Sequence, residues 1–248
     1  MLFYTLFYIK CYPTFDVLGA LFGVDRSVAC RRIQQLLPIL EKTLENTAVL
    51  PKREIKSMKE LFETFPEIKD FFVDGTERPI YRPKDKYEQT DNYSGKKKRH
   101  TIKNIIIVTE KKEIIYLGPT NGGKKHDYTA LKEEFLSNKD VPLPVVGILS
   151  PLNGPRIWLD LGFFGIEKNY PFLNVIIPIK KPKGGKLNTM DKIINKAISS
   201  VRVIVENAIA GVKRFKMVTD VFRNKTADLK DKVMAIACGL WNYHVVYN

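Results

Sequence analysis

The chain of 248 residues is strongly basic, with 41 Lys and Arg against 27 Asp and Glu and a formal net charge of +14. Its 44% hydrophobic and 27% charged residues are typical of a folded globular protein and exclude a disordered or collagen-like chain. The positive charge favours a polyanionic partner, nucleic acid first. Charge alone leaves open a bland alternative, in which the basic residues serve only solubility or loose adhesion to membranes and RNA.

Three cysteines are present, without a Cys-x-x-Cys pair, so the sequence predicts neither a disulfide framework nor a zinc site and fits a reducing compartment. The opening run Met1 to Ile9 is apolar but has no basic leader, and Lys10 and Pro13 follow it closely. It therefore suits neither a signal peptide nor a membrane span, and we expect a buried helix there.

Two further helices are predicted in the first part of the chain. Apolar residues recur at helical spacing from Phe15 to Phe22 and again from Val28 to Leu40, and Gly23 interrupts the pattern. Asp25 is expected to cap the second helix, because its carboxylate can accept the free amide hydrogens of the first turn. The charged segment that follows is expected to be a connector with a helix of its own.

Later in the chain, short runs of β-branched and aromatic residues predict five strands, at residues 71–73, 102–108, 113–117, 157–159 and 175–179. Helices are expected at residues 128–136, 190–215 and 226–245. This order indicates an α/β layer structure with helices on a mixed sheet. We predict three parts: a helical module at 1–48, a helical connector at 49–70 and an α/β domain at 71–248.

Two aspartates follow apolar runs directly. Asp is depleted from strands, yet Asp74 comes immediately after Phe71 to Val73, and Asp160 follows Ile157 to Leu159. The carboxyl ends of strands in open α/β sheets collect functional groups. For each residue an ordinary explanation is as plausible from local sequence: a polar turn at Asp74, and a loop organised by the carboxylate of Asp160.

A third carboxylate, Glu206, lies in a segment whose period is ambiguous at its start. Val201, Val205, Ile209 and Val212 form one face at about 3.6 residues per turn, which favours a helix. Residues 202, 206 and 213 then share a stripe at the margin of this face, and the stripe could project into a cleft. From these residues alone, a surface pair between positions 202 and 206 is the more probable reading.

Four segments together resemble the DDE superfamily of transposases, in its insertion-sequence and Harbinger-like branch. The first two are Val73-Asp74-Gly75-Thr76-Glu77 and the stretch from Tyr93 to Lys103. The third is Gly122 to Asp127, where the family has a small-residue turn before His-Asp. The fourth is Asp160 to Gly165, where the family usually has Asp-x-Gly-Tyr-x-Gly.

The family signature Tyr-x2-Arg-x3-Glu-x6-Lys is similar to the sequence around Glu206, with Arg202 and Lys213 in register and Ser199 at the Tyr position. The resemblance implies a ribonuclease-H-like fold, a mixed five-stranded sheet flanked by helices and preceded by a small all-α helix-turn-helix module. It also implies that Asp74, Asp160 and Glu206 meet at one end of the sheet. There they would act as catalytic residues and hold divalent cations.

Three carboxylates in one site would repel one another unless cations neutralised them. Hard oxygen ligands suit Mg²⁺ or Mn²⁺, and two ions about 4 Å apart could assist displacement at phosphorus. We therefore expect metal-dependent cleavage and strand transfer at transposon ends. His126 and Asp127 are possible neighbours of this site, although Asp127 is as plausible a cap for the next helix.

Several basic residues are expected to bind DNA. Arg202 and Lys213 could hold phosphates near the scissile bond. Two loops are possible phosphate patches, although a solvated basic loop is as plausible for each. These patches comprise Lys96, Lys97, Lys98, Arg99 and His100 in one loop, and Lys180, Lys181, Lys183 and Lys186 in the other. At the start of the second helix, Arg26, Ser27, Arg31 and Arg32 could enter a major groove.

The expected partners are transposon terminal repeats and target DNA, with no membrane partner. The family implies a homo-oligomer, and the compartment would be the cytoplasm or nucleoid of a bacterium or the nucleus of a eukaryote. One alternative is a transposase-derived DNA-binding protein without catalytic activity. Another is a basic RNA-associated structural protein, which would need neither acidic residues at a site nor a metal.

Overall fold

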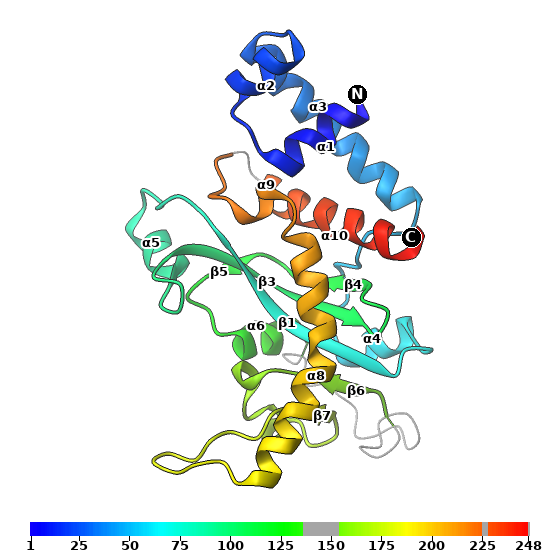
Figure 1. Cartoon of the computed structure of the whole chain (residues 1–248), viewed down its shortest axis with the longest axis vertical. Coiled ribbons are helices and arrows are strands. Elements are labelled where there is room, and N and C mark those ends of the chain that lie inside the picture. Colours follow the sequence, from blue (N-terminus) through cyan, green and yellow to red (C-terminus); the bar gives the residue numbers. More distant parts are fainter. Residues whose placement is uncertain (136–153, 225–227, 248) are drawn as a thin grey trace.

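A computed structural model describes residues 1–135, 154–224 and 228–247 of the chain (Figure 1). A helical module lies at one end of the molecule, a long C-terminal helix lies beneath it, and a twisted sheet crosses the middle. Two ends of the predicted helices, Leu136 and Thr226, lie outside the described residues.

The amino-terminal module consists of α1 (Leu2–Cys11), α2 (Phe15–Phe22) and α3 (Arg26–Asn46), as predicted. The Thr14 hydroxyl caps α2 by accepting from the Val17 amide at 3.4 Å. Gly23 ends α2 with a φ of 63°, a left-handed conformation that glycine adopts without steric cost. Asp25 occupies the N-cap position of α3, but its side chain makes no capping hydrogen bond, so that part of the prediction is wrong.

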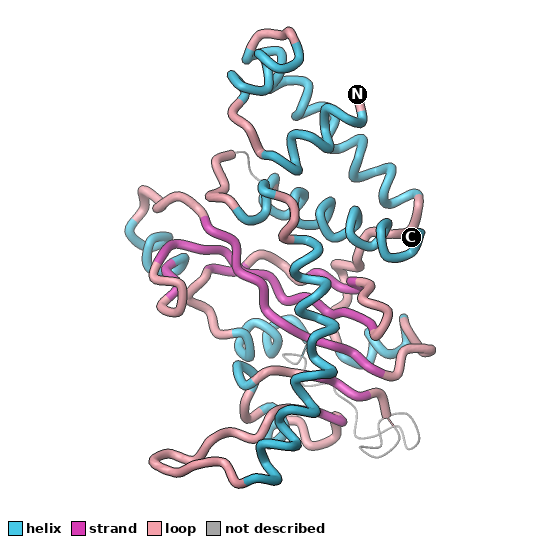
Figure 2. The backbone as a smooth tube through the Cα atoms, in the orientation of Figure 1, coloured by secondary structure: helices cyan, strands magenta, loops and turns pink. Residues whose placement is uncertain are grey.

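All five predicted strands are present in one mixed sheet (Figure 2). Strand β1 pairs antiparallel with β3 and parallel with β6, which in turn pairs parallel with β7. Strand β4 pairs antiparallel with the other side of β3, and two short strands, β2 and β5, also pair with β3. The strands are β1 (Asp70–Pro79), β2 (Tyr93–Ser94), β3 (Arg99–Thr109), β4 (Ile114–Leu117), β5 (Asn121–Gly122), β6 (Arg156–Trp158) and β7 (Asn174–Ile176).

Helices cover both faces of the sheet, which confirms the mixed α/β fold class. The long helix α8 crosses β1 and β3 on one face, and α10 lies beside it (Figure 1). None of the helices in the described part of the chain is long and apolar enough to cross a membrane. The helices that follow the amino-terminal module are α4 (Met58–Thr64), α5 (Lys86–Asn92), α6 (Asp127–Phe135), the short 3₁₀ turn η1 (Leu161–Phe163), α7 (Ile166–Asn169), α8 (Thr189–Val212), α9 (Lys216–Thr219) and α10 (Leu229–Tyr247).

Strand β1 is longer than its apolar run predicts. It continues through Asp74, Gly75 and Thr76 to Pro79, and each of these residues has a partner on β3. The alternative of a polar turn at Asp74 is therefore wrong. The polar residues of this half of β1 have low β-propensity, so the sequence did not predict it as strand. It forms because β3 pairs with it, and such pairing can outweigh low propensity.

The amino-terminal helices share one hydrophobic core with the α8 and α10 side of the sheet. Tyr4 and Leu37 belong to the same buried cluster as Phe72 and Trp241. The Arg223 guanidinium also donates to the backbone carbonyls of Tyr12 and Pro13. The predicted boundary at residue 48 stays a prediction, and no gap in the core marks it.

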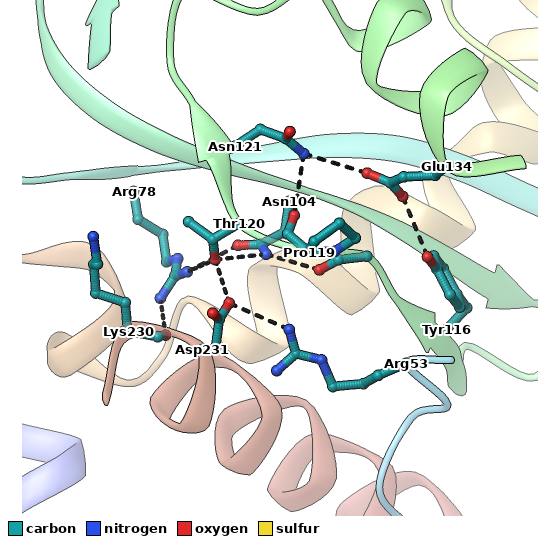
Figure 3. Close-up of polar contacts among 11 residues, drawn as sticks. Arg53, Arg78, Asn104, Tyr116, Pro119, Thr120, Asn121, Glu134, Lys230 and Asp231 are labelled. Atoms are coloured by element: carbon teal, nitrogen blue, oxygen red, sulfur yellow. Dashed lines mark hydrogen bonds and ion pairs between the residues drawn. The ribbon is translucent and has the colours of Figure 1, made fainter. Parts of the chain in front are cut away.

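A polar network joins β1 to the start of α10 (Figure 3). The Arg78 side chain is buried, and it donates to Asn104 Oδ1 and to the Lys230 carbonyl, both at 2.8 Å. Thr120 donates to Asp231, which also pairs with Arg53 at 3.2 Å. Buried polar atoms are costly when unpaired, so this network fixes how α10 meets the sheet.

We predict that Arg78→Met lowers the free energy of unfolding by about 2–3 kcal/mol, because the buried Asn104 oxygen loses its charged donor. Chemical denaturation followed by circular dichroism measures the change. Arg26→Met is the matched control, because the Arg26 side chain is 73% exposed and its ion pair with Asp16 is 3.8 Å long. The control should change stability by no more than about 0.5 kcal/mol; equal losses in both variants would contradict the prediction.

Candidate active site

The pairing of β1 with β6 brings Asp74 and Asp160 together. The two strands are parallel and Phe72 is the partner of Trp158, so residues two positions further along each strand direction also lie side by side. Those residues are Asp74 and Asp160. The carboxylate of Asp160 also accepts a hydrogen bond from the Gly162 amide at 2.8 Å, so the loop-organising role considered for Asp160 is present as well.

The two aspartates are electrostatically coupled. Burial, and then the charge of Asp160, raise the pKa of the Asp74 carboxyl to about 6. The Arg202 guanidinium and the Gly75 amide act in the opposite direction, and Asp127 adds a further negative charge. The positive charge beside Asp74 therefore does not offset the combined effect of burial and of the neighbouring carboxylates on its pKa.

Arg202 on α8 is the cation closest to this pair in the described residues. Its guanidinium lies 3.4 Å from Asp74 Oδ2, and its side chain is only 11% exposed. The surface ion pair considered between Arg202 and Glu206 does not form among the described residues. In this arrangement Arg202 neutralises part of the charge of Asp74, whereas the sequence predicts a contact with phosphate.

Glu206 lies one turn further along α8 and is exposed. The expected meeting of three carboxylates is not seen: within the described residues, no group of three or more His, Cys, Asp or Glu side chains could hold a metal ion. The physical reason is that Arg202, not Glu206, lies against Asp74.

The stripe predicted for α8 ends at Lys213, whose pKa is lowered by partial burial and by the nearby Lys97.

Asp127 enters the site from α6. The helix begins at Asp127 itself, and its carboxylate pairs with the buried Lys103 ammonium at 2.8 Å. A Cβ atom at Gly75 would come within 2.5 Å of Asp127 Oδ1, and one at Gly162 within 3.3 Å of its Oδ2. Glycine at both positions therefore leaves room for the Asp127 carboxylate beside the backbone segments that carry Asp74 and Asp160.

Lys103 is a site residue that sequence reasoning missed. Its side chain is 7% exposed and lies 3.6 Å from Glu77, in addition to its pair with Asp127. The sequence does carry a signal for it: Lys103 lies within the strand-like run around Ile102 to Val108. A lysine buried in such a strand needs anionic partners nearby, which points to a cluster of charged residues.

A large groove opens beside these carboxylates, which we call the α5 groove. Its volume is about 1300 Å³. It extends from α5 and the turn between β2 and β3 to the start of α6. The lining includes Arg82, Lys86, Gln89, Tyr93, Lys96, His100, Lys103, Lys124, Lys125, His126, Asp127, Asp160 and Gly162.

The predicted basic patches lie on exposed turns. The turn that carries Lys96, Lys97, Lys98 and Arg99 is held by hydrogen bonds from the amides of Lys97 and Lys98 to Ser94, while its four basic side chains are exposed. Of the second patch, Lys180 lies over the Phe164 ring at 4.4 Å. In the amino-terminal module, Arg26 and Arg31 are exposed at the start of α3.

The donor chemistry of Asp74 and Asp160 fits a hard divalent cation. Both side chains offer carboxylate oxygens, and burial, followed by repulsion from Asp160, raises the pKa of Asp74. A bound cation would relieve that repulsion. Glu206, as placed here, adds no ligand to this pair, so its part in metal binding stays a prediction.

Comparison with known families accords with this geometry. A family model described as "DDE superfamily endonuclease" matches residues 73–242. A second, described as the helix-turn-helix of DDE superfamily endonuclease, matches residues 1–46. The chain belongs to the DDE superfamily endonucleases. Members generally use divalent metal ions, which agrees with the oxygen ligands of the aspartate pair.

This DDE endonuclease is similar to a probable transposase for insertion sequence element IS702 from Microchaete diplosiphon. The two are 28% identical over 239 residues, which cover 96% of this chain and 77% of the relative. No solved structure matches the chain.

We predict that Asp74→Asn stabilises the protein in metal-free buffer near pH 7.5. The native protein holds the Asp74 proton up to about pH 6, whereas the ordinary pKa is 3.8. The stabilising contribution of Asp74 is therefore full at acid pH and is lost as the pH rises to about 6. Removing the charge should add roughly 2–3 kcal/mol at pH 7.5 and little at pH 4.

Denaturant unfolding at both pH values with a chelator present measures this effect. Asp220→Asn is the control, because Asp220 is exposed. A stabilisation that does not depend on pH would contradict the assigned cause.

Proposed function

We propose that this endonuclease is a transposase that cleaves phosphodiester bonds at the ends of a mobile element and joins them to target DNA. The observation that carries the proposal is the adjacent pair of Asp74, within β1, and Asp160, just after the parallel strand β6, in a chain of the DDE superfamily. The similarity to the IS702 transposase over nearly the whole chain supports the same activity.

In this proposal Asp74, Asp160 and Glu206 are the catalytic residues and hold Mg²⁺ or Mn²⁺, two ions in the complete site. Bound divalent ions would activate the attacking oxygen and stabilise the leaving oxygen at phosphorus. Glu206 would have to turn toward the aspartates, and a single turn of α8 separates it from Arg202, which already reaches Asp74. Arg202 would exchange Asp74 for a DNA phosphate, to which its planar guanidinium can donate two hydrogen bonds.

The alternative of a non-catalytic DNA-binding protein predicts no such charge repulsion at its site. Burial, and then the charge of Asp160, raise the pKa of Asp74, so an ionised Asp74 beside Asp160 costs stability, and a protein that only binds DNA gains nothing from this cost. A structural RNA-binding protein has no use for the pair either. The acidic pair therefore favours catalysis.

We predict that Asp74→Asn, Asp160→Asn and Glu206→Gln each reduce Mg²⁺-dependent cleavage of terminal-repeat DNA by at least about 100-fold and leave DNA binding within about twofold. Cleavage of labelled duplexes and electrophoretic mobility shifts measure the two properties. Glu63→Gln on the exposed face of α4 is the control and should cut like the parent. Parental cleavage by Glu206→Gln would remove Glu206 from the site.

The amino-terminal module is proposed to recognise the terminal repeats through α3. Its match to a helix-turn-helix model and its exposed arginines, Arg26 and Arg31, support this role. The shared core makes deletion of residues 1–48 a poor test, because it would expose buried surface on α10. Substitutions on the exposed side of α3 are the better choice.

We predict that Arg31→Ala weakens binding to the terminal repeats by roughly 5- to 100-fold without changing thermal stability, because base-edge contacts contribute about 1–3 kcal/mol each. Lys42→Ala is the control: Lys42 lies near the other end of α3 and pairs with Glu45 at 2.8 Å. Fluorescence anisotropy with repeat and scrambled duplexes measures binding. Equal losses for both variants, or for both duplexes, would contradict a recognition role.

Finer assignments belong to the same proposal. The motif from Asp160 to Gly165 supports the Harbinger-like branch. We also propose that the active form is a homo-oligomer on paired ends, located with the DNA in the nucleoid or nucleus. Lys96, Lys97, Lys98 and Arg99 would contact phosphates flanking the cut, and Lys213 would join them through its proximity to Lys97.

A further inference from the structure

The α5 groove is larger than a typical small-molecule pocket and reaches Asp160, one member of the aspartate pair. Its volume of about 1300 Å³ exceeds the roughly 300–1000 Å³ of pockets that enclose drug-sized ligands. Asp160 and Gly162 line one end, and Arg82 and Lys86 line the other. A polymer that reaches Asp160 from this side must lie along the groove.

The charges on the groove wall favour a polyanion. Lys86, Lys96 and Lys124 are exposed, and none of them forms an ion pair with another residue in the described ranges. Arg82 is held in place by the Gln89 side chain, whose oxygen accepts from both Nε and a terminal nitrogen, at 3.1 and 2.8 Å. Several exposed ammonium groups without acidic partners on one groove wall are typical of contacts to the phosphates of a polyanion.

The groove also carries an aromatic pair. Tyr93 and His100 pair across β2 and β3, with ring centroids 5.6 Å apart and planes at 71°. An edge-to-face pair covers only one ring face, so further ring faces stay free to stack. Tyr93 is 43% exposed although it lines the groove.

These features distinguish between forms of DNA. In a duplex the base faces are covered by their neighbours in the stack, so an aromatic side chain in a groove can stack only on an unpaired base. Aromatic platforms together with basic walls are the usual means by which proteins hold single strands. Reading of a duplex instead requires an element that protrudes into the DNA groove, which is about 12 Å wide.

We propose that the α5 groove binds an unpaired DNA strand, with a base stacked on the Tyr93–His100 pair and phosphates on Lys86, Lys96 and Lys124. The strand would continue past Asp127 to Asp160, so the inference rests on the proposed function and specifies the form of its substrate near the cut. Single-strand binding by Tyr93 needs no catalysis, which allows the two ideas to be tested separately.

The test measures binding of a fluorescent single-stranded oligonucleotide of about 15 nucleotides by anisotropy, with a chelator present. Tyr93→Ala should weaken binding roughly 5- to 150-fold, because base stacking on an aromatic ring contributes that factor. Tyr93→Phe should bind like the parent. Tyr87→Ala is the matched control, because Tyr87 lies on α5, is 82% exposed and is not part of the groove lining.

Three further probes identify what is bound: an oligonucleotide without bases, a duplex and an RNA of the same sequence. An oligonucleotide without bases keeps the phosphates, so it should bind Tyr93→Ala and the parent equally; Lys96→Ala should weaken binding to both oligonucleotides. A duplex of the same sequence should show no effect of Tyr93→Ala. Parental binding by Tyr93→Ala, an equal loss on the baseless probe, or tighter binding of the matching RNA than of DNA would each overturn the proposal.

Cleavage assays separate this inference from the proposed function. If the parent fails to cut terminal-repeat DNA while single-strand binding still depends on Tyr93, the groove assignment stands and the transposase proposal falls. If the parent cuts and Tyr93→Ala binds single strands normally, only the groove assignment falls. Thermal unfolding should be the same in Tyr93→Ala and Tyr87→Ala, because both side chains are exposed.

Discussion

The parallel pairing of β1 with β6 is the constraint on which the site depends. Because Phe72 is the partner of Trp158, Asp74 within β1 and Asp160 just after β6 come to neighbouring positions, and the Gly162 amide holds the Asp160 carboxylate. The cost is repulsion between two carboxylates in a partly buried place. The hydrophobic cores on both faces of the sheet stabilise the fold enough to offset this repulsion.

Two cations, Arg202 and Lys103, lie beside the carboxylates of the site and reduce their mutual repulsion. Arg202 approaches from α8 on one face of the sheet, and Lys103 from β3 holds Asp127 on the other. These cations limit the negative charge without removing it. The carboxylates of such a site can bind a divalent cation, and the neighbouring Arg202 can bind a phosphate.

Much of the fold was predictable from the sequence, because apolar periodicity reports which residues are buried. All five longer strands and the principal helices lie where the pattern places them. The short α5 and the polar half of β1 were missed, because their residues are exposed or paired only through tertiary contacts. The nearness of Asp74 and Asp160 was implied by the family resemblance, because strand positions alone do not say which strands pair, and Asp74 lies within β1 and not after it. The Lys103–Asp127 pair was not implied, because its register depends on how α6 meets the sheet.

The shared core between the amino-terminal helices and α10 has a geometric consequence. If α3 holds a DNA end, the distance from the recognised bases to Asp74 is set by packed side chains and not by a loose tether. B-form DNA turns once in roughly 10 base pairs, so each added pair would rotate the scissile phosphate by about a tenth of a turn. The element that such an enzyme moves would then have a fixed helical phase between its binding sequence and its tip.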